Sequence, residues 1–309
     1  MSTTEARLVP LAEGVHAFVG AGGDSNAGAI ETPDGLLVID AQQHVPLARR
    51  FRAALAELTP KPLLWLINTH YHLDHTAGNC VFAAEAPVLA HRNCLETFEQ
   101  ILGKEEPLDR PVSDFETQSH LLFGPNIDSL IPEGDPGWDW FRQRLGAPEY
   151  DTVTIAPPTH TFEDRFAFHL PGRTVLLEHL GPAHCRNDII VHLPEDGIVF
   201  TADLLFVGRF PWLGDGDIEG WISALDRISK IGADRVVPGH GPPATMKEVG
   251  EFRDMLAALR GGVAGALEAG MTEDEAVGSV NIAGFDTLPR YKEWMPWNVR
   301  NVYRALRAV

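Results

Sequence analysis

Cysteine is scarce in this 309-residue chain, which contains only Cys80, Cys94 and Cys185. An odd number of cysteines without a CxxC pair argues against a disulfide scaffold and is typical of a reducing cytoplasm. Long apolar runs are missing too, because no stretch reaches the roughly 18 residues of a transmembrane helix. The polar segment 1–7 has neither the basic nor the apolar region of a secretion signal. We therefore expect a cytoplasmic protein without a membrane partner.

Basic residues are also in short supply. Lysine and arginine total 25 against 43 acidic residues, which gives a formal net charge of −18. No block of basic residues interrupts this excess, and nucleic-acid binding depends on basic side chains that neutralise phosphates. The composition therefore predicts no nucleic-acid partner. It favours a small neutral or weakly charged molecule as substrate.

Apolar periodicity indicates an α/β protein. Hydrophobic residues make up 44% of the chain, enough for a sizeable core. We expect a single domain over 1–309 in which two mixed β-sheets lie between helices, an αββα sandwich. Strands are expected near 7–11, 15–20, 26–31, 35–40, 63–68, 87–90, 152–155, 165–170, 173–180, 188–193, 197–201 and 235–237, and helices near 46–58, 77–84 and 217–231, with another around Leu95 and Phe98.

The densest group of metal-ligand residues is the segment 70–75, which reads His-Tyr-His-Leu-Asp-His. It follows an apolar run that ends near residue 68, so it is expected at the end of a buried strand. Imidazole and carboxylate are ligands for zinc, iron and manganese. His70 and His72 can point to one side. Asp74 and His75 are adjacent and diverge, which suits a second ion beside the first.

Three further residues follow strand-like runs in the second half of the chain: His184, Asp203 and His240. A carboxylate at Asp203 has two oxygens and can bridge two cations. Glycines on both sides of His240 let the backbone approach a metal closely. All of these residues are expected in loops along one edge of the sandwich.

In order, residue type and separation, this set resembles the metallo-β-lactamase superfamily of metallohydrolases over roughly residues 8–245. The resemblance implies the metallo-β-lactamase fold and a pair of metal ions. It assigns His70, His72 and His184 to the first metal, Asp74, His75 and His240 to the second, and Asp203 to both. Asp40 would match an acidic residue that orients the metal loop by hydrogen bonds.

The same resemblance implies a binuclear hydrolase of an ester, thioester, lactone or cyclic amide in a small molecule. Two Zn²⁺ per chain are the expected cofactors, with iron or manganese as alternatives. A hydroxide between the metals would attack the carbonyl carbon, and Asp74, a metal-bound water or a residue of a lid would protonate the leaving group. The alternative is a mononuclear iron oxidoreductase of the persulfide dioxygenase type. Glyoxalase II is similar in its motifs, but the C-terminal helices lack a basic cluster for the carboxylates of glutathione.

Two regions lie outside this core pattern. Residues 99–150 form an aromatic-rich insertion, which we interpret as a substrate lid; scaffold packing or a contact in a homo-oligomer are the alternatives. Residues 246–309 form a helical extension expected to pack on the core. Four aromatic side chains are candidate substrate contacts: Trp138, Trp140, Phe210 and Trp212. Cys185, although next to His184, is expected to be buried rather than to bind metal.

Overall fold

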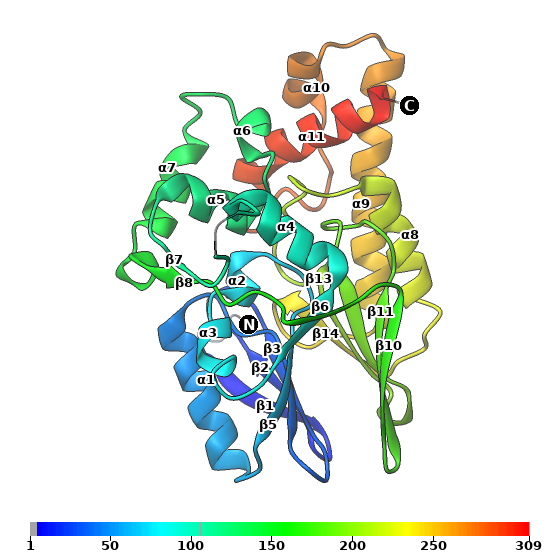
Figure 1. Ribbon diagram of the computed structural model, residues 1–309. Helices are drawn as coiled ribbons and strands as arrows, with labels where there is room; N and C mark the ends of the chain where they lie inside the picture. Colours follow the sequence, from blue (N-terminus) through cyan, green and yellow to red (C-terminus); the bar gives the residue numbers. More distant parts are fainter. Residues whose placement is uncertain (1–4, 106, 309) are drawn as a thin grey trace.

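Two β-sheets form the centre of the molecule in the computed structural model, which describes residues 5–105 and 107–308 (Figure 1). Within these residues the larger sheet has seven strands in the order β1-β2-β3-β4-β5-β6-β9. The strands are β1 (Arg7–Ala12), β2 (Val15–Val19), β3 (Ala27–Glu31), β4 (Leu36–Ile39), β5 (Leu63–Ile67), β6 (Val88–His91) and β9 (His160–Phe162). The three-residue strand β9 was not predicted, because so short a segment carries no readable alternation.

The second sheet has the order β10-β11-β12-β13-β14 within the described residues. It contains β10 (Arg165–Leu170), β11 (Arg173–His179), β12 (Ile189–Leu193), β13 (Ile198–Phe206) and β14 (Arg235–His240). A separate pair consists of β7 (Pro111–Val112), inside the insertion, and β8 (Val153–Thr154), just after it. Both large sheets are mixed, since β4, β5, β6 and β9 run parallel in one, and β13 and β14 in the other.

Helices cover the outer faces of both sheets (Figure 1). They are α1 (Val45–Leu58), α2 (Leu73–Thr76), α3 (Asn79–Phe82), α4 (Arg92–Leu102), α5 (Phe115–Phe123), α6 (Ile127–Leu130), α7 (Gly137–Leu145), α8 (Ile218–Ile228), α9 (Met246–Glu268), α10 (Glu273–Ser279) and α11 (Tyr291–Arg307). The order helix, sheet, sheet, helix confirms the predicted αββα sandwich. Within the described residues no helix is long and apolar enough to cross a membrane.

Alternating side chains of the strands build the core between the sheets. Val15, Ile30 and Leu37 of the first sheet pack with Val191 and Phe200 of the second, all nearly or fully buried. The other face of the first sheet packs on α1, and the outer face of the second sheet packs on α8 and α9. This burial on both faces explains why most strands read as continuous apolar runs.

The insertion and the C-terminal extension meet at one end of the sandwich. Figure 1 shows α5, α6 and α7 gathered at the same end as α10 and α11, above the strands. Their contact is largely aromatic: Phe141 of α7 lies 5.6 Å from Trp297 of α11 between ring centroids. The predicted helical extension and partly helical insertion are therefore both present, and they share one hydrophobic core.

Strand β13 is longer than predicted. The sequence suggested a strand that ends at residue 201, with Asp203 in the following loop, but β13 continues to Phe206. Its pairing with β14 shifts register on both sides of Ala202, which adopts a positive φ of 45°. Asp203 therefore lies inside a strand at a distortion of the ladder. An apolar run cannot reveal such a distortion, because the residues on both sides remain buried.

The close packing of the two sheets at Gly28 is testable. A Cβ atom at Gly28 would lie 2.5 Å from Cε1 of Phe200, and overpacking of this kind typically costs about 1–3 kcal/mol. We expect Gly28→Ala to lower the free energy of unfolding by that amount in urea denaturation. The control is Gly250→Ala in α9, where no atom lies within 4 Å of the added carbon. That change should be neutral or stabilise by up to about 1 kcal/mol; equal effects of the two variants would contradict the packing.

Candidate metal centre

The first group of candidate ligands combines both sheets. His70 and His72 follow β5 of the first sheet, while His184 lies between β11 and β12 and Asp203 lies in β13. One ligand atom from each of these four buried residues lies within 4.8 Å of the others. His184 Nε2 is 2.9 Å from His72 Nδ1 and 3.4 Å from Asp203 Oδ2. Nitrogens this close to one another are typical of ligands that converge on one cation.

The second group shares Asp203. Asp74 and His75 belong to the one-turn helix α2, and His240 is the last residue of β14. Together with Asp203 they offer four ligand atoms within 4.8 Å of one another. His240 Nε2 lies 3.2 Å from Asp74 Oδ2, and His75 Nε2 lies 3.1 Å from Asp203 Oδ1. The structure thus brings together all seven residues that the sequence marked as ligands, in the two predicted groups with Asp203 common to both.

Among the described residues, three buried atoms at the centre make no hydrogen bond of good geometry: His70 Nε2, His75 Nε2 and Asp203 Oδ1, although the last two lie 3.1 Å apart. Buried polar atoms without partners are rare and costly, and unpaired nitrogens and a carboxylate oxygen that face one another are the donor set of a metal site. The residues present therefore fit a pair of metal ions.

The electrostatics of the first group agree with this fit. Burial lowers the pKa of His72 to about 3 and the pKa of His184 to about 4, so both imidazoles are neutral, the form that binds a metal. Burial alone would raise the pKa of Asp203, but His240 and His75 hold it well below its usual value. The carboxylate is therefore ionised. A negative charge inside the protein needs positive charge nearby, which the imidazoles of His75 and His240 or a bound cation can supply.

Close backbone approach at Gly239 is needed to seat Asp203. A Cβ atom at Gly239 would lie 1.8 Å from Asp203 Oδ1, so only glycine fits beside this carboxylate. Ala202, directly before Asp203, has a positive φ, which is an unfavourable backbone conformation for alanine. The predicted role of glycine around His240 thus also extends to Asp203, the carboxylate that both ligand groups share.

Asp40 connects Thr69, at the start of the loop that holds His70 and His72, with His75. Its Oδ1 accepts a hydrogen bond from the backbone N–H of Thr69 at 2.8 Å, and its Oδ2 accepts one from Thr69 Oγ1 at 2.7 Å. Oδ2 also lies 2.8 Å from His75 Nδ1, which leaves His75 Nε2 facing Asp203. The side chain itself is buried and lies outside both ligand groups.

A second supporting pair was not predicted from the sequence. The hydroxyl of Tyr71 lies 3.1 Å from His72 Nε2 and donates a hydrogen bond to Asp215 Oδ2 at 2.9 Å. This arrangement leaves His72 Nδ1 free to face the first group. Asp215 is 144 residues from Tyr71 in the chain, so only the alternation after His70 hinted that Tyr71 would point away from the metal. Nothing in the sequence pointed to Asp215.

A cavity of about 570 Å³ opens onto both groups and is lined by His72, Asp74, His184, Asp203 and His240. Its apolar wall comes from five aromatic residues: Phe123, Trp140, Phe206, Trp212 and Trp294. The insertion and the C-terminal extension both contribute to this wall. The extension was expected only to pack on the core, and the contribution of Trp294 was therefore missed.

The four aromatic side chains proposed from the sequence separate into two pairs. Trp140 and Trp212 line the cavity, whereas Trp138 and Phe210 do not. Trp138 is buried against Phe141, and its Nε1 donates a hydrogen bond to the carbonyl of Pro132. Phe210 is fully buried against Tyr291. Their rings pack instead in the hydrophobic core that the insertion and the extension share.

Cys185 lies outside both ligand groups. It is buried, its Sγ donates to Asp188 Oδ1 at 3.0 Å, and burial raises the pKa of its thiol well above the ordinary value. A thiol that stays protonated is a poor metal ligand. This placement agrees with the expectation that Cys185 is structural.

Comparison with known proteins agrees with this geometry. A family model described as the metallo-beta-lactamase superfamily matches residues 20–240, which include all seven candidate ligands. The chain belongs to the metallo-beta-lactamase superfamily.

Several relatives within the superfamily can be named. A linear primary-alkylsulfatase of Pseudomonas sp. (strain ATCC 19151) is 26% identical over 299 residues, which cover 89% of this chain and 54% of the sulfatase. A metallo-beta-lactamase type 2 of Bacteroides fragilis is 31% identical over 159 residues, 43% of this chain and 63% of the relative. The chain thus spans about half to two thirds of the length of these relatives.

A solved structure extends the likeness of fold beyond the matched region. The sec-alkylsulfatase Pisa1 from Pseudomonas sp. superimposes with a TM-score of 0.68 at 18% identity, over 97% of this chain and 50% of that chain. At this coverage the likeness includes the insertion and the helical extension. It concerns the fold alone.

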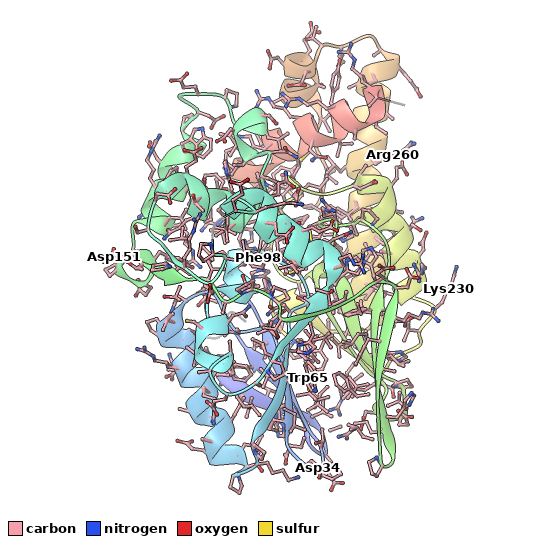
Figure 2. The ribbon with its side chains drawn as sticks, viewed as in Figure 1. Asp34, Trp65, Phe98, Asp151, Lys230 and Arg260 are labelled. Atoms are coloured by element: carbon pink, nitrogen blue, oxygen red, sulfur yellow. The ribbon has the colours of Figure 1, made fainter. Side chains whose placement is uncertain are left out.

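The role of Asp40 in this superfamily member is testable through metal affinity. Asp40→Asn removes the charge that orients His75 and the Thr69 segment, and loss of such an orienting partner typically weakens metal binding by about 10- to 100-fold. We expect that loss in a zinc competition titration with a chromogenic chelator. The control is Asp34→Asn, in the turn that Figure 2 shows at the opposite end of the molecule from α10. Equal affinities of the two variants would contradict the role of Asp40.

Proposed function

We propose that this protein is a binuclear metal-dependent hydrolase that cleaves an ester, thioester, lactone or cyclic amide bond of a small molecule. One observation carries the proposal: two groups of candidate ligands, buried except for the half-buried Asp74, share Asp203 and open onto one cavity. Membership of the metallo-beta-lactamase superfamily and the hydrolase names of its relatives support it.

The ligand set favours two metals. His70, His72 and His184 would hold one ion, Asp74, His75 and His240 the other, and Asp203 both. We propose Zn²⁺ for both, because nitrogen and carboxylate ligands in these numbers suit zinc. A mononuclear iron oxidoreductase is the alternative, but it would leave part of this buried ligand set without a cation.

The chain's own residues supply the rest of the chemistry. When bound, the metal pair would acidify a water molecule and polarise the bond to be cleaved. Asp40 and Tyr71 orient the imidazoles, and the aromatic wall excludes bulk water. Asp74 is our candidate for the proton, because its side chain is 16% exposed, against 4% or less for the ligands paired with it. Its carboxylate can take a proton on the cavity side and return it to the leaving group.

The relatives in the superfamily indicate which classes of bond to test. The alkylsulfatase relative aligns with most of this chain, so sulfate esters join the carbonyl substrates as candidates. The β-lactamase relative supports cyclic amides. A screen of aryl esters, thioesters, lactones, β-lactams and alkyl sulfates would distinguish these classes.

We also propose that the insertion acts as a substrate-binding lid. Leu122 and Phe123 of α5 and Trp140 and Arg144 of α7 line the cavity. An aromatic surface next to the metal ligands can bind apolar substrate and keep water out. The homo-oligomer contact considered from the sequence stays a prediction.

Metal content provides the direct test of the binuclear proposal. Protein purified after expression with zinc should contain close to two metal ions per chain by plasma emission spectrometry. Asp203→Ala should lose at least one of them, since the two ions would no longer share an anion to offset their repulsion, and hydrolysis should fall by at least 100-fold. Circular dichroism serves as the control for folding.

Two outcomes would contradict the proposal. A single tightly bound iron in the unaltered protein would favour the oxidoreductase alternative. Unchanged metal content and turnover in Asp203→Ala would show that this carboxylate does not join the two groups.

The lid proposal predicts different effects of two neighbouring tryptophans in α7. Trp140→Ala removes a ring from the cavity wall and should raise KM severalfold with two metals still bound. Trp138→Ala removes a buried ring that does not reach the cavity, so it should lower the free energy of unfolding while KM changes little. Steady-state kinetics well below the melting temperature give the KM of both variants. Urea denaturation gives their free energies of unfolding. Equal KM values for the two variants would contradict a role of the wall in substrate binding.

A further inference from the structure

Three arginines converge on the cavity although the chain as a whole is strongly acidic. Arg144 comes from α7, Arg209 follows β13, and Arg290 directly precedes α11. They are separated by 65 residues or more in the sequence, and only the fold gathers them. Their like charges disfavour one another: burial lowers the pKa of Arg209 to about 10, and the charges of Arg290 and Arg144 add to this effect. At neutral pH Arg209 remains a cation.

Arg209 lies beside the second ligand group. Its Nη1 donates a hydrogen bond to the carbonyl of Gly23 at 2.8 Å and lies 3.2 Å from His240 Nδ1. Its Nε is buried and has no hydrogen-bond partner. Within residues 5–105 and 107–308, no carboxylate oxygen lies within the 4.0 Å of an ion pair with Arg209. A half-buried guanidinium without an ion pair is costly unless an anion joins it.

The other two arginines are already partly neutralised. Arg144 Nη2 lies 3.8 Å from Asp24 Oδ1, and Arg290 Nη1 donates to Glu293 Oε1 at 3.3 Å. Asp74 and Asp203, the carboxylates that stabilise the charge of Arg209 from a distance, belong to the ligand groups and would be neutralised by metal ions. Arg209 is therefore the cation of this cavity whose charge is unmatched.

Aromatic rings fill the space between the cations. The guanidinium carbon of Arg209 lies 4.8 Å from the ring centroid of Trp294, and that of Arg290 lies 4.6 Å from Trp140. The two indoles contact each other edge to face at 6.0 Å. The rings hold the guanidinium planes in place by cation–π attraction and at the same time present apolar surface to the cavity.

We propose that the substrate is a small organic anion whose oxyanion binds Arg209 while its apolar body lies against Trp140 and Trp294. The proposal rests on the proposed hydrolase function and narrows its substrate class. It replaces the neutral or weakly charged substrate expected from net charge, because the local charge at the cavity differs in sign from that of the surface. A carboxylate or a sulfate offers the two oxygens that a planar guanidinium binds side by side.

Binding can be tested without turnover. The probes are 3-phenylpropanoate, phenyl sulfate and the neutral 3-phenylpropanamide, titrated into metal-loaded protein with tryptophan fluorescence as the readout. We expect both anions to bind at least 10-fold more tightly than the amide, with the tighter one identifying the oxyanion. Arg209→Gln should weaken anion binding by about 10- to 100-fold, the usual range for charge-assisted hydrogen bonds, and leave binding of the amide unchanged. Arg209→Lys should give an intermediate loss, because an ammonium keeps the charge but not the planar fork.

The matched control is Arg260→Gln. Arg260 lies on the outer side of α9 (Figure 2) and pairs with Glu219 at 2.7 Å. This variant should bind all three probes as the unaltered protein does. If Arg209→Gln fails to fold by circular dichroism, the Arg209→Lys result decides, and unchanged anion affinity there would overturn the proposal.

Turnover provides the second arm. Hydrolysis of the 4-nitrophenyl monoester of glutaric acid is compared with hydrolysis of 4-nitrophenyl pentanoate, which has a methyl group in place of the carboxylate, and with hydrolysis of 4-nitrophenyl sulfate. We expect an anionic substrate to have the lower KM, and Arg209→Gln to remove that advantage. An anion preference that survives in Arg209→Gln would place the anion on the metals and overturn the proposal. Anion binding through Arg209 without hydrolysis of any substrate would instead contradict the hydrolase function and leave the binding site standing.

Discussion

The carboxylate of Asp203 is the constraint on which the rest of the site depends. It belongs to both ligand groups and is reached by imidazoles that follow β5 of the first sheet and by others from the second sheet. The site therefore exists only when the two sheets pack together. The distorted backbone at Ala202 and the missing Cβ of Gly239 are local costs of placing one anion where both groups reach it.

Support for the candidate ligands comes from residues that lie outside both ligand groups. Asp40 ties His75 to the start of the metal loop, and Tyr71 links His72 to Asp215. Such partners select the ring nitrogen that faces the cation and hold the ring still. The orientation of the candidate ligands therefore depends on the whole hydrogen-bonded network, and not on the ligand residues alone.

The cavity wall around the candidate metal centre comes largely from other segments than the ligands do. The sandwich supplies the metal ligands, whereas the insertion and the C-terminal extension supply most of the aromatic wall. Three arginines reach the same cavity from three segments, so a strongly acidic protein presents positive charge next to its candidate metal site. Net charge describes long-range attraction and repulsion, but recognition at a few ångströms depends on the groups that line the cavity.

The sequence by itself determined the ligand set and the two-sheet architecture. Ligand types are few, His70 to His75 are close in the chain, and strand periodicity is a local property. The structure decided what depends on distant segments: that Asp203 lies inside β13, that Trp140 faces the cavity while Trp138 is buried in the core, and that Arg209 and Arg290 line the same cavity. These features depend on packing between segments far apart in the chain, and a local pattern of residues carries no information about such packing.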